Sequence, residues 1–408
     1  MPNYRPIFLS IALLGSVYQA VAQNPLVQQI IDEVNIDSLM NDLGLLSGEA
    51  PVNVGNGEEL IVSRNKNQPG NPLAADWLQQ RFEELGYTAT VQVFSAGTGE
   101  NIIAEKTGSL HPERKVVICG HYDAMPGGPV AAPAADDDGS GTVAVLEAAR
   151  VLAPYTFENT IVFALWDEEE QGKLGSIFYA GVAAGNDVEI TGAVNMDAIS
   201  YDGDGDGLMR VHTKTIANSI ALKDSAVMVN ALYAGLNLPM AINLPGATYS
   251  DHASFWSENY GAILIIEDFD NDGNPHYHTS TDLVDFIDQP YFHGLARLGI
   301  GTAAVLAKPV SDPTAILENT ARPAKESIFA YPNPTHGTTQ VRVTALGGQA
   351  RLSLHNSLGL ELMELGDGTF APGRHSFSFN AQDLAPGAYV IRFTSGGMTS
   401  TFPIVRIP

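Results

Sequence analysis

The spacing of hydrophobic and polar positions in the N-terminal part of the chain predicts helices followed by a pair of strands. Between residues 25 and 46, apolar side chains recur every three or four positions, which is typical of one or two amphipathic helices. A further helix is predicted from 71 to 85 and ends before Gly86, a residue favoured just beyond a helix C-terminus. Residues 88–94 then alternate between polar and apolar side chains, which predicts a strand paired with 101–105.

Beyond residue 115 the pattern changes to continuous apolar runs that alternate with helical segments. Such runs are expected for strands buried on both faces, and one intervening segment, 142–153, is apolar almost all round and is predicted to be a helix. The pattern predicts an α/β fold with a mostly parallel, twisted sheet flanked by helices on both faces. Its expected strands are 116–119, 161–166, 192–196 and 262–266.

The C-terminal fifth of the chain has a third pattern. Prolines and scattered charges over 309–326 are typical of a linker. From 327 to 408, short alternating runs separated by Gly and Pro turns predict a small β-sandwich. We therefore expect an α/β domain over 23–308, a linker and a β-sandwich domain.

The first 22 residues have the organisation of a secretory signal peptide. Arg5 provides a weakly basic start, 7–17 an apolar core, and Ala20-Val21-Ala22 a small-residue cleavage site. No later stretch reaches about 18 apolar residues, the length that a membrane-spanning helix needs. We therefore expect an exported protein without a transmembrane segment.

The charge and cysteine content narrow the possible partners. A net charge of −25 from 46 acidic and 21 basic residues argues against nucleic acid, because phosphate binding requires clusters of basic residues. The acidity is instead typical of a soluble protein outside the cell. Cys119 is the single cysteine, so no intrachain disulfide can form.

Acidic and histidine residues follow the predicted strands one after another. In an open α/β sheet, ligands bind beyond the carboxyl ends of the strands, so residues at these positions are expected to meet. Imidazole and carboxylate are zinc ligands. The candidates that follow strands are His121, Glu169, Glu170, Asp197 and His278, and Asp137 lies in the Ala- and Gly-rich segment after the first strand.

Two ions fit this set if one carboxylate bridges them, and Asp137 is the candidate bridge. His121 and Asp123 form an H-x-D pair, in which Asp123 can accept the free imidazole N–H and hold its tautomer. Glu169 and Glu170 can divide their roles between general base and metal ligand. Spacing alone leaves two choices open: which aspartate of 136–138 binds metal, and which histidine among His252, His276 and His278.

Six ordered motifs resemble the M28 family of zinc peptidases, over roughly residues 25–308. By that resemblance, His121 and Asp197 hold one zinc ion, Glu170 and His278 hold the other, and Asp137 bridges them. Glu169 is then the general base, Asp123 the partner of His121, and Tyr277 an oxyanion-stabilising residue. Some family members have a cis peptide after the bridging aspartate. The motifs are G-H-Y-D at 120–123, D-D-D-G-S-G at 136–141, E-E-Q-G-K-L-G-S at 169–176, N-M-D at 195–197, S-D-H-A-S-F at 250–255 and Y-H-T-S-T-D at 277–282.

Two features depart from the family pattern. Lys173-Leu174 stands where the family usually has leucine first. Two segments, 202–207 and 268–273, match the first half of a calcium loop, D-x-D-x-D-G, but carry Thr213 and Thr279 where that loop ends in glutamate. Calcium is therefore a weaker prediction than zinc.

The tail from Tyr331 resembles the C-terminal sorting domain of the type IX secretion system. The opening Y-P-N-P-T and the segment L-A-P-G-A-Y-V-I-R-F at 384–393 carry the likeness, although the final strand, 402–406, lacks the usual lysines. The resemblance implies a Gram-negative source, export through the periplasm to the surface or the medium by the type IX machinery, and removal of the tail.

The function expected from these features is a secreted zinc aminopeptidase acting on peptides. A single-zinc glutaminyl cyclase is the nearest alternative, although its members usually lack the D-D-G-S-G stretch. A carboxypeptidase would need a cation near the site for the substrate carboxylate, and few basic residues lie near the motifs. A non-catalytic binding module would have lost ligands, whereas every ligand position here is filled.

Overall fold

The computed structural model describes residues 23–310, except 56 and 96–97, and residues 327–407, except 332, 334, 346, 357–358, 372 and 396–397. The expected signal peptide (1–22) and most of the expected linker (311–326) lie outside the described residues. The chain divides into two compact units, one ending at Val310 and one beyond it, and each is described by itself.

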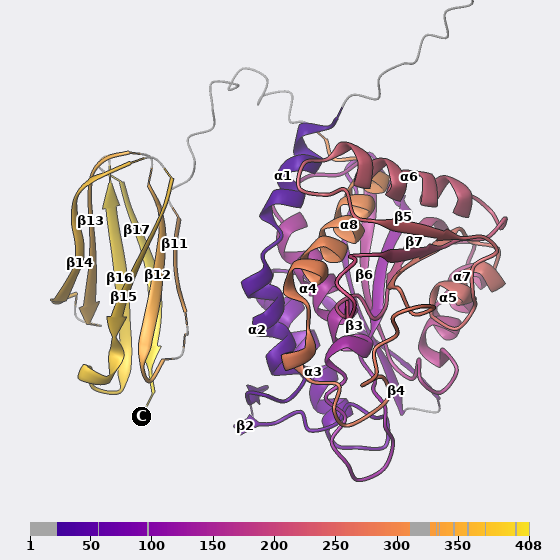
Figure 1. The fold of residues 1–408 in the computed structure, drawn as a ribbon, viewed down its shortest axis with the longest axis horizontal. Coiled ribbons are helices and arrows are strands. Elements are labelled where there is room, and N and C mark those ends of the chain that lie inside the picture. The colour runs from indigo at the N-terminus through magenta and orange to yellow at the C-terminus, as the bar shows by residue number, and fades with distance from the viewer. Residues whose placement is uncertain are drawn as a thin grey trace, which may run out of the picture. The chain divides into compact units, whose positions relative to one another are not determined.

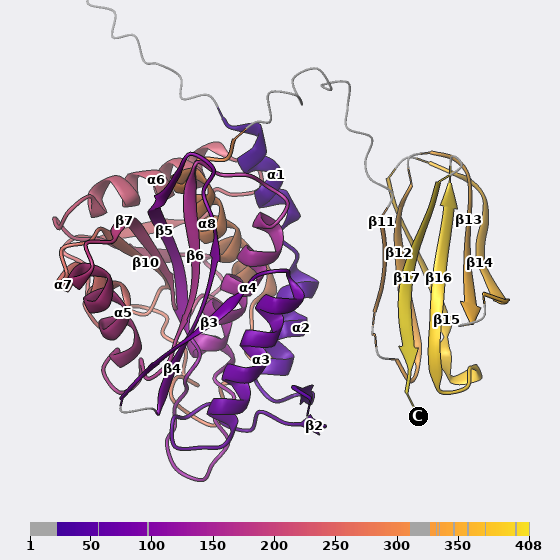
Figure 2. The same ribbon diagram turned by 180° about the vertical axis from the view of Figure 1, so that it is seen from behind.

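An eight-stranded mixed sheet forms the centre of the first unit (Figures 1 and 2). Four strands in the middle, β6, β5, β7 and β10, run parallel, β4 and β8 are antiparallel to their inner neighbours, and the outermost strands β3 and β9 pair with β4 and β8. In order across the sheet the strands are β3 (Ala89–Phe94), β4 (Gly99–Lys106), β6 (Asn159–Trp166), β5 (His111–His121), β7 (Glu189–Met196), β10 (Ala262–Glu267), β8 (Met209–His212) and β9 (Met240–Asn243). The expected α/β fold is confirmed, and the antiparallel strands at its edges make the sheet mixed.

Helices cover both faces of this sheet, as Figures 1 and 2 show. Several begin at asparagine or aspartate caps: the side chains of Asn24, Asn35 and Asp288 accept N–H groups from the first turn of α1, α2 and α8. The helices are α1 (Pro25–Glu33), α2 (Ile36–Leu46), α3 (Gly70–Glu84), α4 (Gly141–Leu152), α5 (Leu174–Gly185), α6 (Ser219–Leu232), α7 (His252–Ser257) and α8 (Gln289–Ala307).

The continuous apolar runs of the central strands are explained by two separate cores. Alternate residues of a strand point to opposite faces, so Val116 and Ile118 of β5 pack in the larger core with helices α1 to α4, α6 and α8. Val117 and Cys119 pack on the other face, in a smaller core with α5 and α7. Cys119 is fully buried there, as expected for a small hydrophobic side chain.

The second unit is a β-sandwich, as its alternating pattern predicts. Its sheets have the orders β11-β12-β15 and β14-β13-β16-β17, with antiparallel pairing throughout both, and side chains from both sheets share one core. Its strands are β11 (Ser327–Tyr331), β12 (Thr338–Ala345), β13 (Gly348–Asn356), β14 (Glu361–Phe370), β15 (Gly373–Asn380), β16 (Gly387–Ser395) and β17 (Met398–Arg406).

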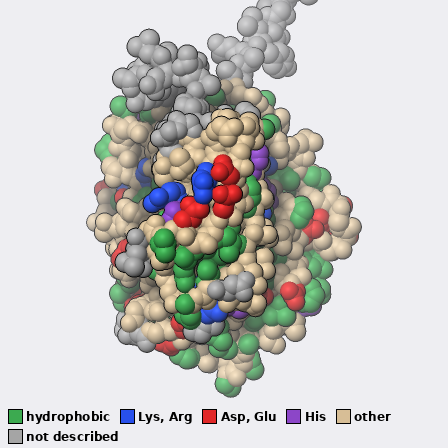
Figure 3. Space-filling model, turned by 90° about the vertical axis from the view of Figure 1, so that its left-hand side faces the viewer, with side chains coloured by type: hydrophobic (Ala, Val, Ile, Leu, Met, Phe, Trp, Pro, Cys, Tyr) green, Lys and Arg blue, Asp and Glu red, His purple; other side chains and the backbone are tan. Residues whose placement is uncertain are grey.

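Charged side chains of this second unit lie on its surface. Arg351 pairs with Glu361, Glu364 and Asp367, and all four side chains are exposed. Figure 3 shows acidic and basic side chains next to one another, beside hydrophobic ones, on the face that it draws. None of the helices in the described part of the chain is both long and apolar enough to cross a membrane.

Candidate metal centre

Four neighbouring strands deliver the candidate ligands to one edge of the sheet. His121 is the last residue of β5, Asp197 directly follows β7, and Glu169 and Glu170 lie in the turn after β6. His278 lies in the segment that follows β10. Because these strands are parallel neighbours, their carboxyl ends meet, and the side chains converge as the sequence predicts.

The converging side chains form two groups that share Asp137. In the first group, Nε2 of His121 lies 3.3 Å from Oδ1 of Asp137 and 3.6 Å from Oδ1 of Asp197. In the second, Nε2 of His278 lies 3.1 Å from Oδ2 of Asp137 and 2.9 Å from Oε2 of Glu170. The two oxygens of Asp137 thus face different histidines, which is the arrangement a bridging carboxylate requires.

Several of these donor atoms are buried without a well-formed hydrogen bond among the described residues. Oδ2 of Asp137, Oε1 of Glu170 and Nε2 of His278 are buried and make no well-formed hydrogen bond, although Nε2 of His278 lies within ion-pair distance of Asp137 and Glu170. A buried polar atom without a partner costs roughly 1–3 kcal/mol, and more when it is charged. Two imidazole nitrogens and three carboxylates are also the donor types that zinc prefers. The residues therefore fit two zinc ions.

The two aspartates that flank Asp137 are held by other groups. Asp136 accepts hydrogen bonds from the N–H and hydroxyl of Ser200. Asp138 accepts the backbone N–H groups of His121 and Gly141. Only Asp137 faces the histidines, so the structure resolves an ambiguity that spacing left open. The peptide between Asp137 and Asp138 is cis.

Glycine allows the segment after these aspartates to approach the sheet. A Cβ atom on Gly141 would lie 2.3 Å from the carbonyl oxygen of Met196, at the end of β7. No side chain can replace this glycine without moving the start of α4. The glycine of D-D-D-G-S-G at position 141 therefore holds Asp137 against the strand that leads to Asp197.

The competing histidines lie elsewhere. The Nε2 atom of His252 lies 2.8 Å from the carbonyl oxygen of Ala247, and its ring packs edge-on against Trp256. His276 is hydrogen bonded through Nδ1 to Thr281 and stacks on Phe286. The geometry therefore selects His278, which adopts a left-handed backbone conformation with a φ of 58°. Such backbone strain in a non-glycine residue is common at functional sites.

Asp123 joins the loop after β5 to the turn after β6. Its carboxylate accepts the backbone N–H groups of Glu169 and Glu170, at 2.9 and 3.2 Å. Its Oδ1 lies 3.4 Å from Nδ1 of His121, whereas the carbonyl oxygen of Asp123 lies closer, at 3.2 Å. The expected contact with the imidazole is thus shared with the backbone, and Asp123 also positions both glutamates, a role that the sequence does not reveal.

Glu169 lies in the site without facing a histidine as a ligand does. Burial raises the pKa of Glu169 to about 10, opposed by His121 and reinforced by Asp251, Asp197 and Asp123. Positive charge next to a carboxyl group lowers its pKa. Cations held by the neighbouring donors would therefore return Glu169 to the ionised form that a general base requires.

Three supporting residues could not have been found from spacing. Arg64 is fully buried, and its guanidinium donates hydrogen bonds to the carbonyl oxygens of Leu46, Tyr122, Pro133 and Ala134. Asp282 accepts the backbone N–H groups of Asp136 and Asp137. Ser250 donates to Asp197 and accepts from Asn195. Asp282 and Ser250 lie in two of the six ordered motifs, but a motif does not show which residues they are hydrogen bonded to.

The metal-ligand groups open into a cavity of about 220 Å³. Its walls include Glu169, the apolar side chains of Ile266 and Phe269, and the rings of Tyr249 and Tyr277. Burial, followed by the neighbouring carboxylates, raises the pKa of Tyr277, so its hydroxyl keeps its proton near neutrality. The cavity thus combines carboxylates, a hydroxyl donor and an apolar wall.

The two predicted calcium loops differ. Carboxylate oxygens of Asp202, Asp204 and Asp206 lie within 4.8 Å of one another. In the other loop, Asp268 and Asp270 both pair with Arg210, and Asp272 accepts the N–H groups of residues 203 and 204. Calcium binding stays a prediction for both loops, although the carboxylates of the second already accept from Arg210 and from backbone N–H groups.

The sequence also matches known families and proteins. The sequence model of peptidase family M28 matches residues 101–302, and that of a secretion system C-terminal sorting domain matches 329–406. Leucine aminopeptidase 1 of Trichophyton equinum is 30% identical over 58% of this chain and 67% of its own length. A probable zinc metalloprotease of Pyrenophora teres f. teres is 24% identical over 75% of this chain and 72% of its own length.

Two solved structures share the fold. The LapA aminopeptidase of Legionella pneumophila matches with a TM-score of 0.60 and 22% identity, over 71% of this chain and 77% of its own. The glutaminyl cyclase of Porphyromonas gingivalis matches with a TM-score of 0.52 and 20% identity, over 66% of this chain and 98% of its own. Both likenesses concern the arrangement of the backbone.

Proposed function

The chain belongs to peptidase family M28 and carries a secretion system C-terminal sorting domain, and from this premise we propose that it is a secreted aminopeptidase that uses two zinc ions. The observation that carries the proposal is the pair of donor groups that share Asp137. A single-ion site would need only one of them. The names of the relatives, leucine aminopeptidase and zinc metalloprotease, point to the same class of activity.

The roles of the residues follow from their positions. His121 and Asp197 would hold one zinc ion, Glu170 and His278 would hold the other, and Asp137 would be shared by both. Bound zinc supplies Lewis acidity, which lowers the pKa of water and polarises the carbonyl of the scissile peptide bond.

Proton transfer falls to Glu169, which lies in the cavity with an uncommitted carboxyl group. It takes a proton from the attacking water and delivers it to the leaving amine, so the same group acts as base and then as acid. The hydroxyl of Tyr277 donates to the oxyanion that develops on the carbonyl oxygen. Asp123 keeps Glu169 and Glu170 in register through their backbone N–H groups.

The charge and shape of the cavity favour a free N-terminus as the substrate group. A protonated α-amine is attracted to a site rich in carboxylates. The apolar wall of Ile266 and Phe269 then accepts an apolar first side chain, such as leucine.

Export is proposed from the C-terminal unit. Its match to a secretion system sorting domain supports recognition by type IX machinery, with passage through the periplasm. We expect the peptidase unit to act at the cell surface or outside the cell.

A substrate panel tests the proposal and separates it from its rivals. Leucyl-p-nitroanilide, an N-acetylated peptide and an N-terminal glutaminyl peptide are incubated with the purified protein, and zinc is counted on the same sample. The proposal predicts hydrolysis of the nitroanilide with two zinc ions per chain. Cyclisation of the glutaminyl peptide with one zinc ion would favour the cyclase, and cleavage of the blocked peptide alone would favour a carboxypeptidase.

A further inference from the structure

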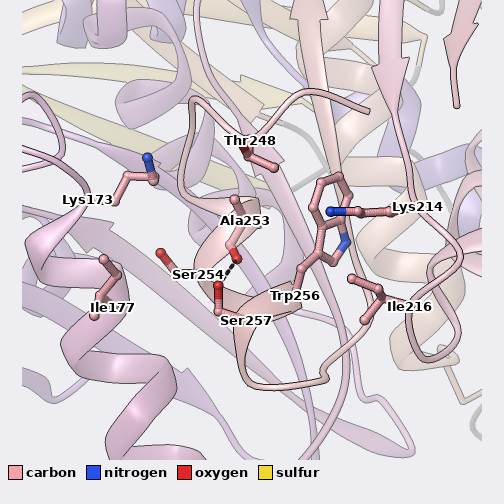
Figure 4. Close-up of a pocket in the computed structure, with 9 residues that line it drawn as sticks. All are labelled: Lys173, Ile177, Lys214, Ile216, Thr248, Ala253, Ser254, Trp256 and Ser257. Atoms are coloured by element: carbon pink, nitrogen blue, oxygen red, sulfur yellow. Dashed lines mark hydrogen bonds between the residues drawn. The ribbon is translucent and has the colours of Figure 1, made fainter. Parts of the chain in front are cut away.

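A second cavity, of about 340 Å³, lies between α5, α7 and the segment after β8. Two lysines, Lys173 and Lys214, stand on its walls together with the indole of Trp256 and the side chains of Thr248, Ser254 and Ser257 (Figure 4). None of these residues belongs to the metal centre. We name this space the lysine cavity.

The lysines of this cavity differ from the others in the described part of the chain. Four of the others, Lys66, Lys115, Lys223 and Lys308, form ion pairs with carboxylates, and Lys106 donates to a backbone carbonyl. Lys173 and Lys214 have no acidic partner among the described residues, although the chain carries 46 acidic residues. Two lysines without an acidic partner on the walls of one cavity, in a protein this acidic, are suited to bind an anionic ligand.

The walls hold this charge in place. Nζ of Lys214 lies 5.6 Å from the centre of the Trp256 ring, a cation–π contact that orients the ammonium group without neutralising it. Figure 4 shows Lys173 and Lys214 on opposite sides of the cavity, with Thr248 and Ala253 between them. Ser257 donates to the carbonyl of Ala253, and Ser254 is hydrogen bonded to Ser176, so both serine hydroxyls of the short helix α7 are held in place.

At two places in the chain, residues that line the lysine cavity lie close in sequence to residues that line the metal cavity. Thr248 lines the lysine cavity and its neighbour Tyr249 lines the metal cavity. The turn that begins at Glu169 ends at Lys173, closed by a hydrogen bond of 2.7 Å from the N–H of Lys173 to the carbonyl of Glu169. The walls of the two cavities are therefore joined through the chain at these two points.

The position of Glu169 indicates which part of a bound peptide would lie near the lysine cavity. Since Glu169 delivers the proton to the leaving amine, the departing peptide lies on the Glu169 side of the scissile bond. Lys173 lies at the other end of the turn that Glu169 begins. We propose that the lysine cavity binds a carboxylate of the departing peptide, either its C-terminal carboxylate in a short substrate or an acidic side chain in a longer one. This inference rests on the proposed aminopeptidase activity and adds its substrate class.

The test compares pairs of substrates that differ by one carboxylate. Leucyl-oligoglycines with one to four glycines are assayed as free acids and as C-terminal amides, since each added residue extends the reach by about 3.4 Å. A second series places aspartate or asparagine at the same positions in amidated peptides and separates the two sources of the carboxylate. At one length, kcat/KM is expected to favour the acid by about tenfold, as for a hydrogen bond to a charged group.

Variants assign the preference to the cavity. Lys173→Met and Lys214→Met each reduce the acid-to-amide ratio, the double variant brings it close to one, and arginine at either position retains it. Hydrolysis of leucyl-p-nitroanilide, which has no carboxylate, is unchanged in all of them and shows that they fold. Lys115→Met is the matched control, because it removes one positive charge about 20 Å from His121 along β5 and leaves the ratio unchanged.

The outcomes separate this inference from the proposed function. Hydrolysis of leucyl-p-nitroanilide with equal rates for acids and amides at every length overturns the lysine cavity as a carboxylate site and leaves the aminopeptidase standing. Cleavage of N-acetylated acids alone, with a preference lost in the lysine variants, overturns the aminopeptidase and keeps the cavity. If nothing is cleaved, calorimetric titration with Gly-Asp and Gly-Asn decides: tighter binding of Gly-Asp supports the cavity, and equal binding contradicts it.

Discussion

The two units of this chain differ in whether their carboxylates are buried. Among the described residues of the first unit, fourteen Asp and Glu residues are buried. Among the described residues of the C-terminal unit, no Asp or Glu is buried, and the buried polar residues there are threonine, serine and one histidine. Both units have ordinary apolar cores, so the difference is not one of packing.

The difference shows where the chain is organised for chemistry. An ionised carboxylate in a low-dielectric interior is destabilising by several kcal/mol unless cations or hydrogen bonds compensate. In the first unit, buried carboxylates at the sheet edge accept backbone N–H groups, as Asp123 and Asp138 do, and the positive charge of Arg64 lies close to them. In the C-terminal unit, charged side chains such as Arg351 pair on the surface. A unit recognised by secretion machinery has no need of a buried charge.

The largest effect is expected from Glu169→Gln. Replacing the general base by an isosteric amide removes the proton transfer and should lower kcat by about three orders of magnitude. The zinc content should stay unchanged, because Glu169 is not a ligand. Steady-state kinetics with zinc analysis on the same sample checks both results.

Glu168→Gln is the matched control for that variant. Glu168 is adjacent in sequence and also buried, but its carboxylate is bound to Ser95 and Lys66 and does not line the metal cavity. We expect this variant to keep most of the activity. Loss of zinc in Glu169→Gln, or equal losses of activity in both variants, would mean that the roles of base and ligand are wrongly assigned.

A pair of arginine variants compares the two units directly. Arg64→Met leaves four buried carbonyl oxygens without their donors and should reduce the stability of the first unit by about 3–5 kcal/mol. Arg351→Met removes an exposed cation and should leave the C-terminal unit's melting temperature unchanged. Differential scanning calorimetry of the full chain records both transitions. Equal shifts in the two variants would contradict the contrast between the units.

A smaller effect is expected from His252 at acid pH. Burial lowers the pKa of His252 to about 3, against 6.5 for the unperturbed side chain. Between pH 6.5 and 3, His252 is protonated in the unfolded chain and neutral in the folded one. The free energy of unfolding therefore falls as the pH decreases through this range. Between pH 7 and 5 the loss from this one histidine is roughly 2 kcal/mol.

Denaturant unfolding of the wild-type protein and of His252→Gln at both pH values measures this loss as a difference. The variant should lose less stability than the wild type over the same interval. Parallel losses in the two proteins would show that His252 titrates normally in the folded state.

The smallest effect on catalysis is expected from removal of the C-terminal unit. Deleting residues 325–408 should leave kcat/KM on leucyl-p-nitroanilide within about twofold of the full chain, because no group of the metal centre lies there. The same deletion should abolish export from the native host. A truncated protein that binds zinc and hydrolyses nothing would place part of the active site in the second unit.

The fold can largely be predicted from the sequence where periodicity is strong. Runs such as 116–119 and 161–166 predict the parallel centre of the sheet, and the alternation after 327 predicts the sandwich. The edge strands β8 and β9 are not predicted, because each has only four residues. Short segments carry too little pattern to be recognised, and their pairing depends on tertiary contacts.

The residues of the site can be predicted from the sequence, but the hydrogen bonds and contacts that hold them in place largely cannot. Strand-end positions alone predict that His121, Glu170 and Asp197 lie together, and the family resemblance favours Asp137 and His278. Spacing does not reveal that Asp136 and Asp138 are held by Ser200 and backbone N–H groups. Nor does it place Arg64 beneath the site or gather the two lysines of the lysine cavity, since these contacts join segments far apart in the chain.

Zinc stoichiometry shows whether the metal centre holds two ions or one. Metal-free protein is titrated with zinc, unbound metal is removed by gel filtration, and the zinc per chain is measured by mass spectrometry in the wild type and in Asp137→Ala. We expect two tightly bound ions per chain in the wild type and fewer in the variant, which lacks the shared carboxylate. A wild-type protein that saturates at one ion, or a variant that still binds two, would contradict this expectation.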